Sequence, residues 1–330
     1  MILRNLSRNY TMASTTRSSP FTQAVLTAVR KLYPEQLADK SFDNTGLLLE
    51  APHRPNYLRN SVLLTIDLTT AVADEAIKRK DSVVIAYHPI IFRGLKSLTL
   101  GNTQQSSLLR LAQEGISVYS PHTAVDAAPG GLNDWLADII VGQTTQEFDV
   151  LEHDRSVITP VEDVFPYTGA GYGRIIKFKS PQTLSSLLSR INSPTGLGSF
   201  RGISVAVPQS VRPGSKGDIK ISSVGICAGS GGHMLGGLDV DLLFTGEMSH
   251  HEALAAIEQG RVLITAFHSN SERGFLKNRM QAALQAKITE EISEELMEAD
   301  GLDELRNGFE VAVSESDRDP FEIVTSLDGW

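Results

Sequence analysis

Most histidines of this sequence stand where ligands usually bind in an α/β protein. Six of the eight follow segments expected to be buried β-strands, or lie in the turns after them: His88, His122, His233, His250, His251 and His268. Open α/β sheets bind ligands just outside the carboxyl ends of their strands. The sequence therefore predicts a functional site at a set of strand ends.

Two of these histidines have a carboxylate four residues later: His122 precedes Asp126, and His268 precedes Glu272. If a helical turn begins there, each pair shares one face. Imidazole nitrogen with carboxylate oxygen suits Zn²⁺, Mn²⁺, Fe²⁺ or Co²⁺. The alternative is a helix start, where acids are favoured by the helix dipole. Two pairs in equivalent places, with His88 at a third strand end, favour a metal site.

The segment TGEMSHHEAL adds candidates for proton transfer or for orienting metal ligands. Glu247 is expected at a strand end, with His250 and His251 in the first helical turn. Glu247 or His122 would be the general base, or would position a ligand from behind. The plainer interpretation of this segment is an ordinary helix N-terminus.

Glycine-rich segments carry a weaker signal. The run Gly229–Gly232 follows an expected strand and fits either an anion bound by backbone N–H groups or a tight turn. The sequence contains no GxxxxGK[ST] phosphate loop and no serine-hydrolase elbow with suitable flanks.

Strands alternate with helices twice along the chain, which predicts an α/β fold of two similar lobes with mostly parallel sheets. In each half, three strands follow one another, and the third runs into the His-x-x-x-acid element. The expected organisation is a flexible leader or transit peptide (1–19) and one domain (20–330), composed of lobe one (20–150), a connecting segment (151–218) and lobe two (219–330).

Composition narrows the class of protein. The chain has 330 residues, 41% hydrophobic and 21% charged, with a net charge of −9, which argues against general nucleic-acid binding. No apolar run approaches the roughly 20 residues of a membrane span. The single cysteine, Cys227, excludes an intrachain disulfide and a cysteine-based zinc cluster and fits a reducing compartment.

The ends of the chain differ in charge. No acidic residue precedes Glu35, and Arg4, Arg8 and Arg17 lie among serines and threonines. This is typical of a mitochondrial transit peptide, or of a disordered tail with a second start at Met12. A mitochondrial or cytoplasmic location is expected. The acidic stretch 290–305 is predicted to be a solvated helix.

Eight motifs in order resemble the Nif-three-like family (NGG-interacting-factor-three-like proteins, also called GTP cyclohydrolase type-two-like). They are FDNTGLLL, LLTIDLT, AYHPIIF, SPHTAVDAAPGGLND, CAGSGG, LLFTGEMSHHEAL, FHSNSER and SESDRDPF, and the match runs from about Phe21 to the end. The resemblance implies two similar α/β lobes with a dinuclear metal site between them at strand ends. It also implies a homo-oligomer such as a hexamer and, from the family name, a transcription-related adaptor as protein partner.

Carried over by motif, the family's metal ligands are His88, Asp126, His268 and Glu272. His122 would then support the site from behind the ligands. This sequence has Tyr87 where many members of the family have a second histidine. A phenol with a pKa of about 10 is a poor ligand at neutral pH. Tyr87 thus stays a candidate ligand at a metal position that is weaker, filled by water, or selective for a harder ion such as iron.

The expected function is a metal-dependent hydrolase of unknown substrate, with two divalent ions (Zn, Fe, Mn or Co) activating a water and Glu247 or His122 moving protons. Opening of the GTP ring has no support in the residues, because nothing in the sequence reads guanine. Two alternatives are a non-catalytic metal-binding regulatory or interaction protein, and a metal-trafficking protein.

Overall fold

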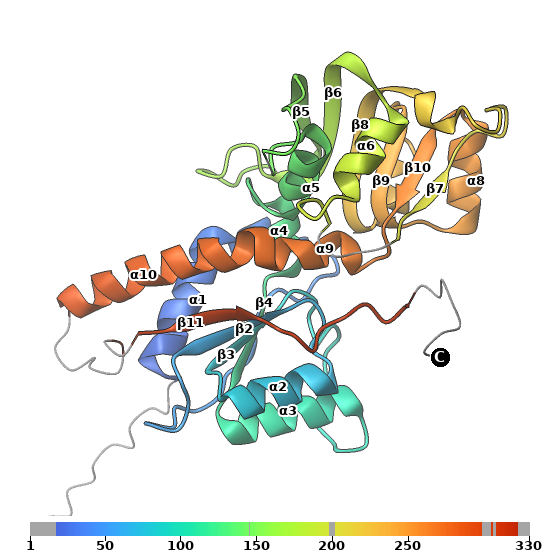
Figure 1. Cartoon of the computed structure of the whole chain (residues 1–330). Coiled ribbons are helices and arrows are strands. Elements are labelled where there is room, and N and C mark those ends of the chain that lie inside the picture. The colour runs from blue at the N-terminus through green and yellow to red at the C-terminus, as the bar shows by residue number, and fades with distance from the viewer. Residues whose placement is uncertain (1–17, 145, 198–201, 299–304, 306–307, 323–330) are drawn as a thin grey trace, which may run out of the picture.

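The computed structural model describes residues 18–144, 146–197, 202–298, 305 and 308–322, and folds them into two β-sheets with helices packed against both (Figure 1). The first sheet has the strand order β1–β4–β3–β2–β11. Its strands are β1 (Gly46–Leu49), β2 (Ser61–Thr65), β3 (Val83–Ala86), β4 (Ser117–Ser120) and β11 (Glu310–Val313). The strand β11 has no counterpart among the predicted elements; it pairs in parallel with β2.

The second sheet has the order β5–β6–β8–β9–β10–β7. Its strands are β5 (His153–Pro160), β6 (Gly171–Thr183), β7 (Ser204–Ala206), β8 (Lys220–Ser230), β9 (Leu242–Glu247) and β10 (Val262–Thr265). Strands β5, β6 and β7 come from the segment predicted to connect the lobes.

The two sheets share a core arrangement. Strands β2, β3 and β4 lie parallel and adjacent in the first sheet, as do β8, β9 and β10 in the second. An antiparallel strand flanks the third member each time, β1 beside β4 and β7 beside β10. The carboxyl ends of each parallel trio therefore meet at one edge.

Both sheets are mixed, which corrects the prediction of mostly parallel sheets. The first sheet departs from parallel pairing only at β1 within the described residues, but β5, β6 and β7 all pair antiparallel in the second. For β5 and β6 the cause is local: the Gly- and Pro-containing loop 161–170 joins them directly, which permits an antiparallel return without a crossover helix.

Helices pack against both faces of the first sheet, and further helices cover the second sheet. They are α1 (Pro20–Leu32), α2 (Thr70–Arg79), α3 (Thr103–Glu114), α4 (His122–Ala127), α5 (Leu132–Val141), α6 (Leu184–Ile191), α7 (Gly232–Leu235), α8 (His250–Glu258), α9 (Asn270–Phe275) and α10 (Gln281–Glu298). In Figure 1, α2 and α3 lie side by side on one face of the first sheet, while α1 and α10 cross and pack against each other on its other face.

This layering arises because successive side chains of a strand point to opposite faces of the sheet. Leu63 of β2 packs into the cluster that includes α2 and α3, whereas its neighbours Val62 and Leu64 belong to the main core, which is shared with α1, α5, α10 and the second sheet. Because the first sheet is buried on both faces, its central strands read as continuous apolar runs.

A network of partly buried ion pairs ties α5 to the second sheet. Asp134 accepts two hydrogen bonds from the guanidinium of Arg174, at 2.7 and 2.8 Å, and Arg174 is only 2% exposed. Asp138, one turn later, accepts from Arg155 on β5 and from Arg279, each at 2.6 Å. The paired geometry is of the strong, charge-assisted kind, so it holds α5 against the second sheet.

The helix predicted from Arg273 onward is interrupted. Between α9 and α10 the chain makes a π-helical turn at Leu276–Met280. Turns of this kind often lie near functional sites. The predicted leader (1–19) lies almost wholly outside the described residues, and so does the end of the acidic stretch 290–305 beyond Glu298. Among the described residues, no helix combines the length and apolar character needed to cross a membrane.

Candidate metal centre

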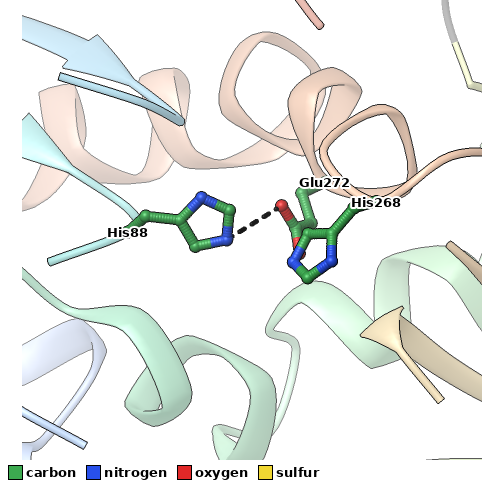
Figure 2. A group of neighbouring side chains, drawn as sticks. All are labelled: His88, His268 and Glu272. Carbon is green, nitrogen blue, oxygen red and sulfur yellow. Dashed lines mark ion pairs between the residues drawn. The ribbon is translucent and has the colours of Figure 1, made fainter. Parts of the chain in front are cut away.

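Three predicted ligands come together from two distant parts of the chain. His88 follows β3, His268 follows β10, and Glu272 lies in α9. One donor atom from each can be chosen so that all three lie within 4.8 Å of one another. Figure 2 shows His88 facing the other two across a gap, with Nε2 3.4 Å from Glu272 Oε2. His268 Nε2 lies 3.5 Å from Glu272 Oε1. These separations exceed good hydrogen-bond lengths, so the donors converge on a shared space.

A carboxylate holds each of these imidazoles from behind. His88 Nδ1 lies 2.9 Å from Asp67 Oδ1, and His268 Nδ1 lies 2.8 Å from Glu247 Oε1. When Nδ1–H donates to a carboxylate, Nε2 keeps its lone pair, and this is how metal-binding histidines are commonly oriented. The prediction placed Glu247 as a general base or as an orienting residue, and here it contacts His268.

A third histidine has the same support. His122 Nδ1 lies 2.7 Å from Asp43 Oδ1, and its ring centroid is 5.5 Å from that of His88. Burial alone would raise the pKa of Asp43, but hydrogen bonds from His122, Thr123 and Thr45 lower it to about 2. His122 is therefore held beside a carboxylate that stays ionised. It lies outside the group of three convergent donors.

Asp126, a predicted ligand on α4, is engaged by Tyr87. The Tyr87 hydroxyl donates a hydrogen bond to Asp126 Oδ1 at 2.7 Å. Burial and the nearby charges of Asp126 and Glu272 raise the pKa of Tyr87 well above its ordinary value. Burial, together with the charge of Glu272, raises the pKa of Asp126 to about 6, against the opposing effects of His122, His88 and the Tyr87 hydrogen bond. Tyr87 is thus a protonated donor in this structure.

The surroundings of Glu272 and Gly229 indicate whether a cation fits between the donors. Glu272 is 1% exposed, and its Oε2 has no hydrogen-bond partner among the described residues. A buried carboxylate oxygen without a partner is unfavourable unless a cation compensates it. Gly229 has φ +61°, and a Cβ there would lie 2.8 Å from Glu272 Oε1 and 3.0 Å from His268 Nε2. The backbone therefore leaves open the space next to the donors, and these residues fit a divalent ion.

The backbone is strained at or next to the two histidines that follow the third parallel strand of each sheet. His122 itself has φ 28°, and Phe267, just before His268, has φ 63°. Left-handed backbone is uncommon for residues other than glycine and costs about 1–3 kcal/mol at such sites. The surrounding fold holds both segments in this conformation, directly after β4 and β10.

The C-terminal motif SESDRDPF joins the two halves of this centre. Asp317 accepts a hydrogen bond from the backbone N–H of Ile66 at 2.8 Å and forms an ion pair with Arg273. Ile66 precedes Asp67, and Arg273 follows Glu272. Ser269 also donates to Asp319 at 2.8 Å. The segment thus links the part of the site that follows β2 to the part that lies on α9.

An open cleft of about 740 Å³ contains the predicted metal residues. His88, His122, Asp126, His268 and Glu272 line it, together with Tyr87, His233 and Cys227. Burial and nearby carboxylates raise the pKa of Cys227 to about 12, so this thiol stays protonated. His250 and His251 contact each other on α8 and do not line the cleft.

Comparison with known proteins assigns this chain to a protein family. The sequence profile of Duf34/NIF3 (NGG1p interacting factor 3) matches residues 22–301. This chain belongs to the Duf34/NIF3 family. The resemblance predicted from the eight motifs is therefore confirmed.

Duf34/NIF3 relatives match over most of their length. The chain is 48% identical over 264 residues to the "Protein NIF3 homolog" of Schizosaccharomyces pombe, covering 80% of this chain and 88% of that protein. It is 38% identical over 305 residues to "NGG1-interacting factor 3" of Saccharomyces cerevisiae, covering 90% and 94%.

Solved structures share the Duf34/NIF3 fold at low identity. A Bacillus cereus protein related to NIF3 gives a TM-score of 0.65 at 20% identity, covering 92% of this chain and 98% of that one. Reduced HcgD from Methanocaldococcus jannaschii gives 0.63 at 20% identity, covering 89% and 97%. At this identity the likeness establishes the fold alone.

Several residues of this Duf34/NIF3 site were not predicted from the sequence. Asp67 and Asp43 hold two of the histidines, and Asn133 links Asp126 to the second sheet by donating to its carbonyl and accepting from Ala228 N–H. Asp67 follows the strand β2 at the same edge as His88, a signal that the strand-end argument could have used.

Proposed function

We propose that this chain is a metal-dependent hydrolase that binds two divalent ions at unequal positions. The observation that carries the proposal is a buried Glu272 oxygen without a hydrogen-bond partner among the described residues, faced by imidazoles that carboxylates hold in place. Because the cleft around it is open and sizeable, a catalytic centre is favoured over a closed structural one.

The stronger position would be formed by His88, His268 and Glu272, whose donor atoms already converge. The weaker position would use Asp126, on the side of the cleft where Tyr87 and His122 lie next to each other. It has fewer free donors, because the Tyr87 hydroxyl occupies one Asp126 oxygen. The ions would be Zn, Fe, Mn or Co, which suit imidazole and carboxylate donors.

Divalent ions at such a site polarise the bond to be cleaved and lower the pKa of a bound water. The chain's own residues would supply the remaining steps. His122 would carry a proton within the cleft, since Asp43 holds its Nδ1 and leaves the other ring nitrogen available. Glu247, whose side chain is 54% exposed, would position His268 and link it to solvent.

The test combines metal content with turnover. Purified protein would be analysed for metals by mass spectrometry and assayed against panels of phosphoesters, amides and cyclic C–N substrates. Glu272→Ala and Asp126→Ala should lose metal and turnover together. Glu258→Ala, an exposed glutamate on α8, is the matched control and should retain both. Full activity in Glu272→Ala would rule the proposal out.

A second candidate is a non-catalytic metal-binding interaction protein. It is favoured by the name of the S. cerevisiae relative, NGG1-interacting factor 3, which implies a protein partner. Under this alternative the metals stabilise the fold, so their removal lowers the unfolding midpoint while no compound in the panels is turned over. Homo-oligomeric assembly and a mitochondrial or cytoplasmic location are further parts of the proposal.

A further inference from the structure

Two phenylalanines stand half exposed on the wall of the metal cleft. Phe42 is 53% exposed and Phe92 is 46% exposed, and both line the cleft that contains His88 and Glu272. Their ring centroids lie 6.3 Å apart, with the rings tilted by 40°. Contiguous apolar side chains left open at the rim of a site usually mark a surface that a ligand covers.

The two rings are held at fixed places relative to the metal residues. Phe42 directly precedes Asp43, which binds His122, and Phe92 follows His88 by four residues. The side-chain amide of Asn44 donates to the carbonyl of Ile91, joining the two segments next to the rings. The aromatic pair and the convergent donors therefore form one preorganised surface.

The charged residues that line the cleft indicate which class of ligand it can bind. Among the described residues that line it, none is a lysine or an arginine. A polyphosphate chain is usually neutralised by such side chains together with metal ions, so beyond the proposed metal ions the described lining offers a longer chain no cationic side chain. Tyr172 and Met234 extend the lining, and a methionine sulfur makes favourable contacts with aromatic rings. The lining thus suits an aromatic compound of low charge and is poorly suited to a nucleoside triphosphate.

We propose that the substrate carries a planar aromatic or heteroaromatic ring and at most one phosphate, and that this ring packs against Phe42 and Phe92. Its reacting group then reaches His88, His268 and Glu272. The inference rests on the proposed metal-dependent hydrolase and names its substrate class. Aromatic rings pack on one another in offset or tilted geometry, and a saturated ring gains less from such contact.

The test uses two matched pairs of probes, with binding measured by calorimetry on the purified, metal-containing protein. Adenosine monophosphate is compared with ribose 5-phosphate, which lacks the ring, and phenyl phosphate with cyclohexyl phosphate, which lacks planarity. The wild type should bind the aromatic member of each pair about tenfold more tightly. Adenosine triphosphate should bind no more tightly than the monophosphate.

Substitution of the rings should remove the preference and leave the metals in place. In Phe42→Ala/Phe92→Ala, the affinity for adenosine monophosphate should fall about tenfold to that of ribose 5-phosphate, with unchanged metal content. Leu100→Ala is the control, because Leu100 lies on the same loop as Phe92, is 74% exposed and does not line the cleft.

Two results would overturn the inference. One is equal affinity of the wild type for both members of each pair, including no binding of either. The other is a double variant that keeps the preference but changes its oligomeric state in light scattering, which would assign the rings to contact with a second copy. Failure of the hydrolase proposal is seen separately, as metal and activity retained in Glu272→Ala.

Discussion

The hydroxyl of Tyr87 donates to Asp126 Oδ1 at 2.7 Å and so occupies a carboxylate oxygen at the edge of the metal cleft. A histidine at this place would offer a lone pair, whereas the protonated phenol offers a proton. The side chain that precedes His88 therefore affects how many free donors face the proposed second metal position.

Replacing Tyr87 should change the number of bound ions. Tyr87→His should raise the metal content from about one to about two ions per chain, because it adds a nitrogen donor and frees Asp126. Tyr87→Phe, which removes the hydroxyl and adds no donor, should stay near one. Mass spectrometry after dialysis measures the content, and circular dichroism checks the fold. Two tightly held ions in the wild type would contradict the unequal positions.

Gly229 should be sensitive to a single methyl group. In Gly229→Ala, the new Cβ would lie 2.8 Å from Glu272 Oε1 and 3.0 Å from His268 Nε2, so one of the donors must shift. We expect metal affinity, measured by competition with a chelator, to fall by about tenfold or more.

Gly130→Ala separates this effect from backbone strain. Gly130 also has positive φ, +72°, but a Cβ there meets nothing within 4 Å. Both variants should lose about 1 kcal/mol of stability from the left-handed backbone. Only Gly229→Ala should lose metal, and equal metal affinity in the two variants would contradict the close-approach argument.

The fold was predictable where local pattern decides structure. Runs such as SVLLTIDLT led to β2, and the expected helix from about Pro20 begins at that residue, with Ser19 as its N-cap. The strand β11 was missed because EVAV is short and polar at its start, and its partner β2 lies far away in the sequence. The π-helical turn before α10 leaves no clear periodic signal.

The convergence of His88, His268 and Glu272 was predictable because strand ends gather at sheet edges. The supporting contacts were harder to foresee. Asp43 reaches His122 from a turn distant in sequence, and such pairing depends on how whole elements pack. The order of the motifs indicated that these segments contribute to the site. No pattern within one segment predicts which of its atoms contacts a side chain of another segment.

Asp67 should matter through His88. It lies 2.9 Å from His88 Nδ1 and holds the ring with Nε2 toward the gap. Asp67→Asn should lower metal affinity by about 10- to 100-fold, as for other residues behind metal ligands. Asp74→Asn, in an exposed ion pair with Arg110, is the control and should bind metal like the wild type. Equal affinity in both variants would mean that His88 needs no such support.

The ion pair between Asp134 and Arg174 should give the fold an acid-sensitive component. Burial would raise the pKa of Asp134, but the hydrogen bonds and charge of Arg174 lower it below its ordinary value. A carboxylate whose folded pKa is depressed stabilises the fold above its unfolded pKa of about 4, and this contribution is lost as the pH falls through the lower folded value.

Asp134→Asn should therefore lower the free energy of unfolding by about 3 kcal/mol at neutral pH, because it leaves the buried Arg174 charge without its partner. Urea unfolding between pH 7 and pH 3 measures the effect, and the difference from wild type should shrink as the pH falls below about 4. Asp154→Asn, which breaks an exposed pair with Lys179, should leave the midpoint unchanged. A difference between wild type and Asp134→Asn that stays constant down to pH 3 would mean that the variant acts through packing, because the loss of a titrating ion pair must vary with pH.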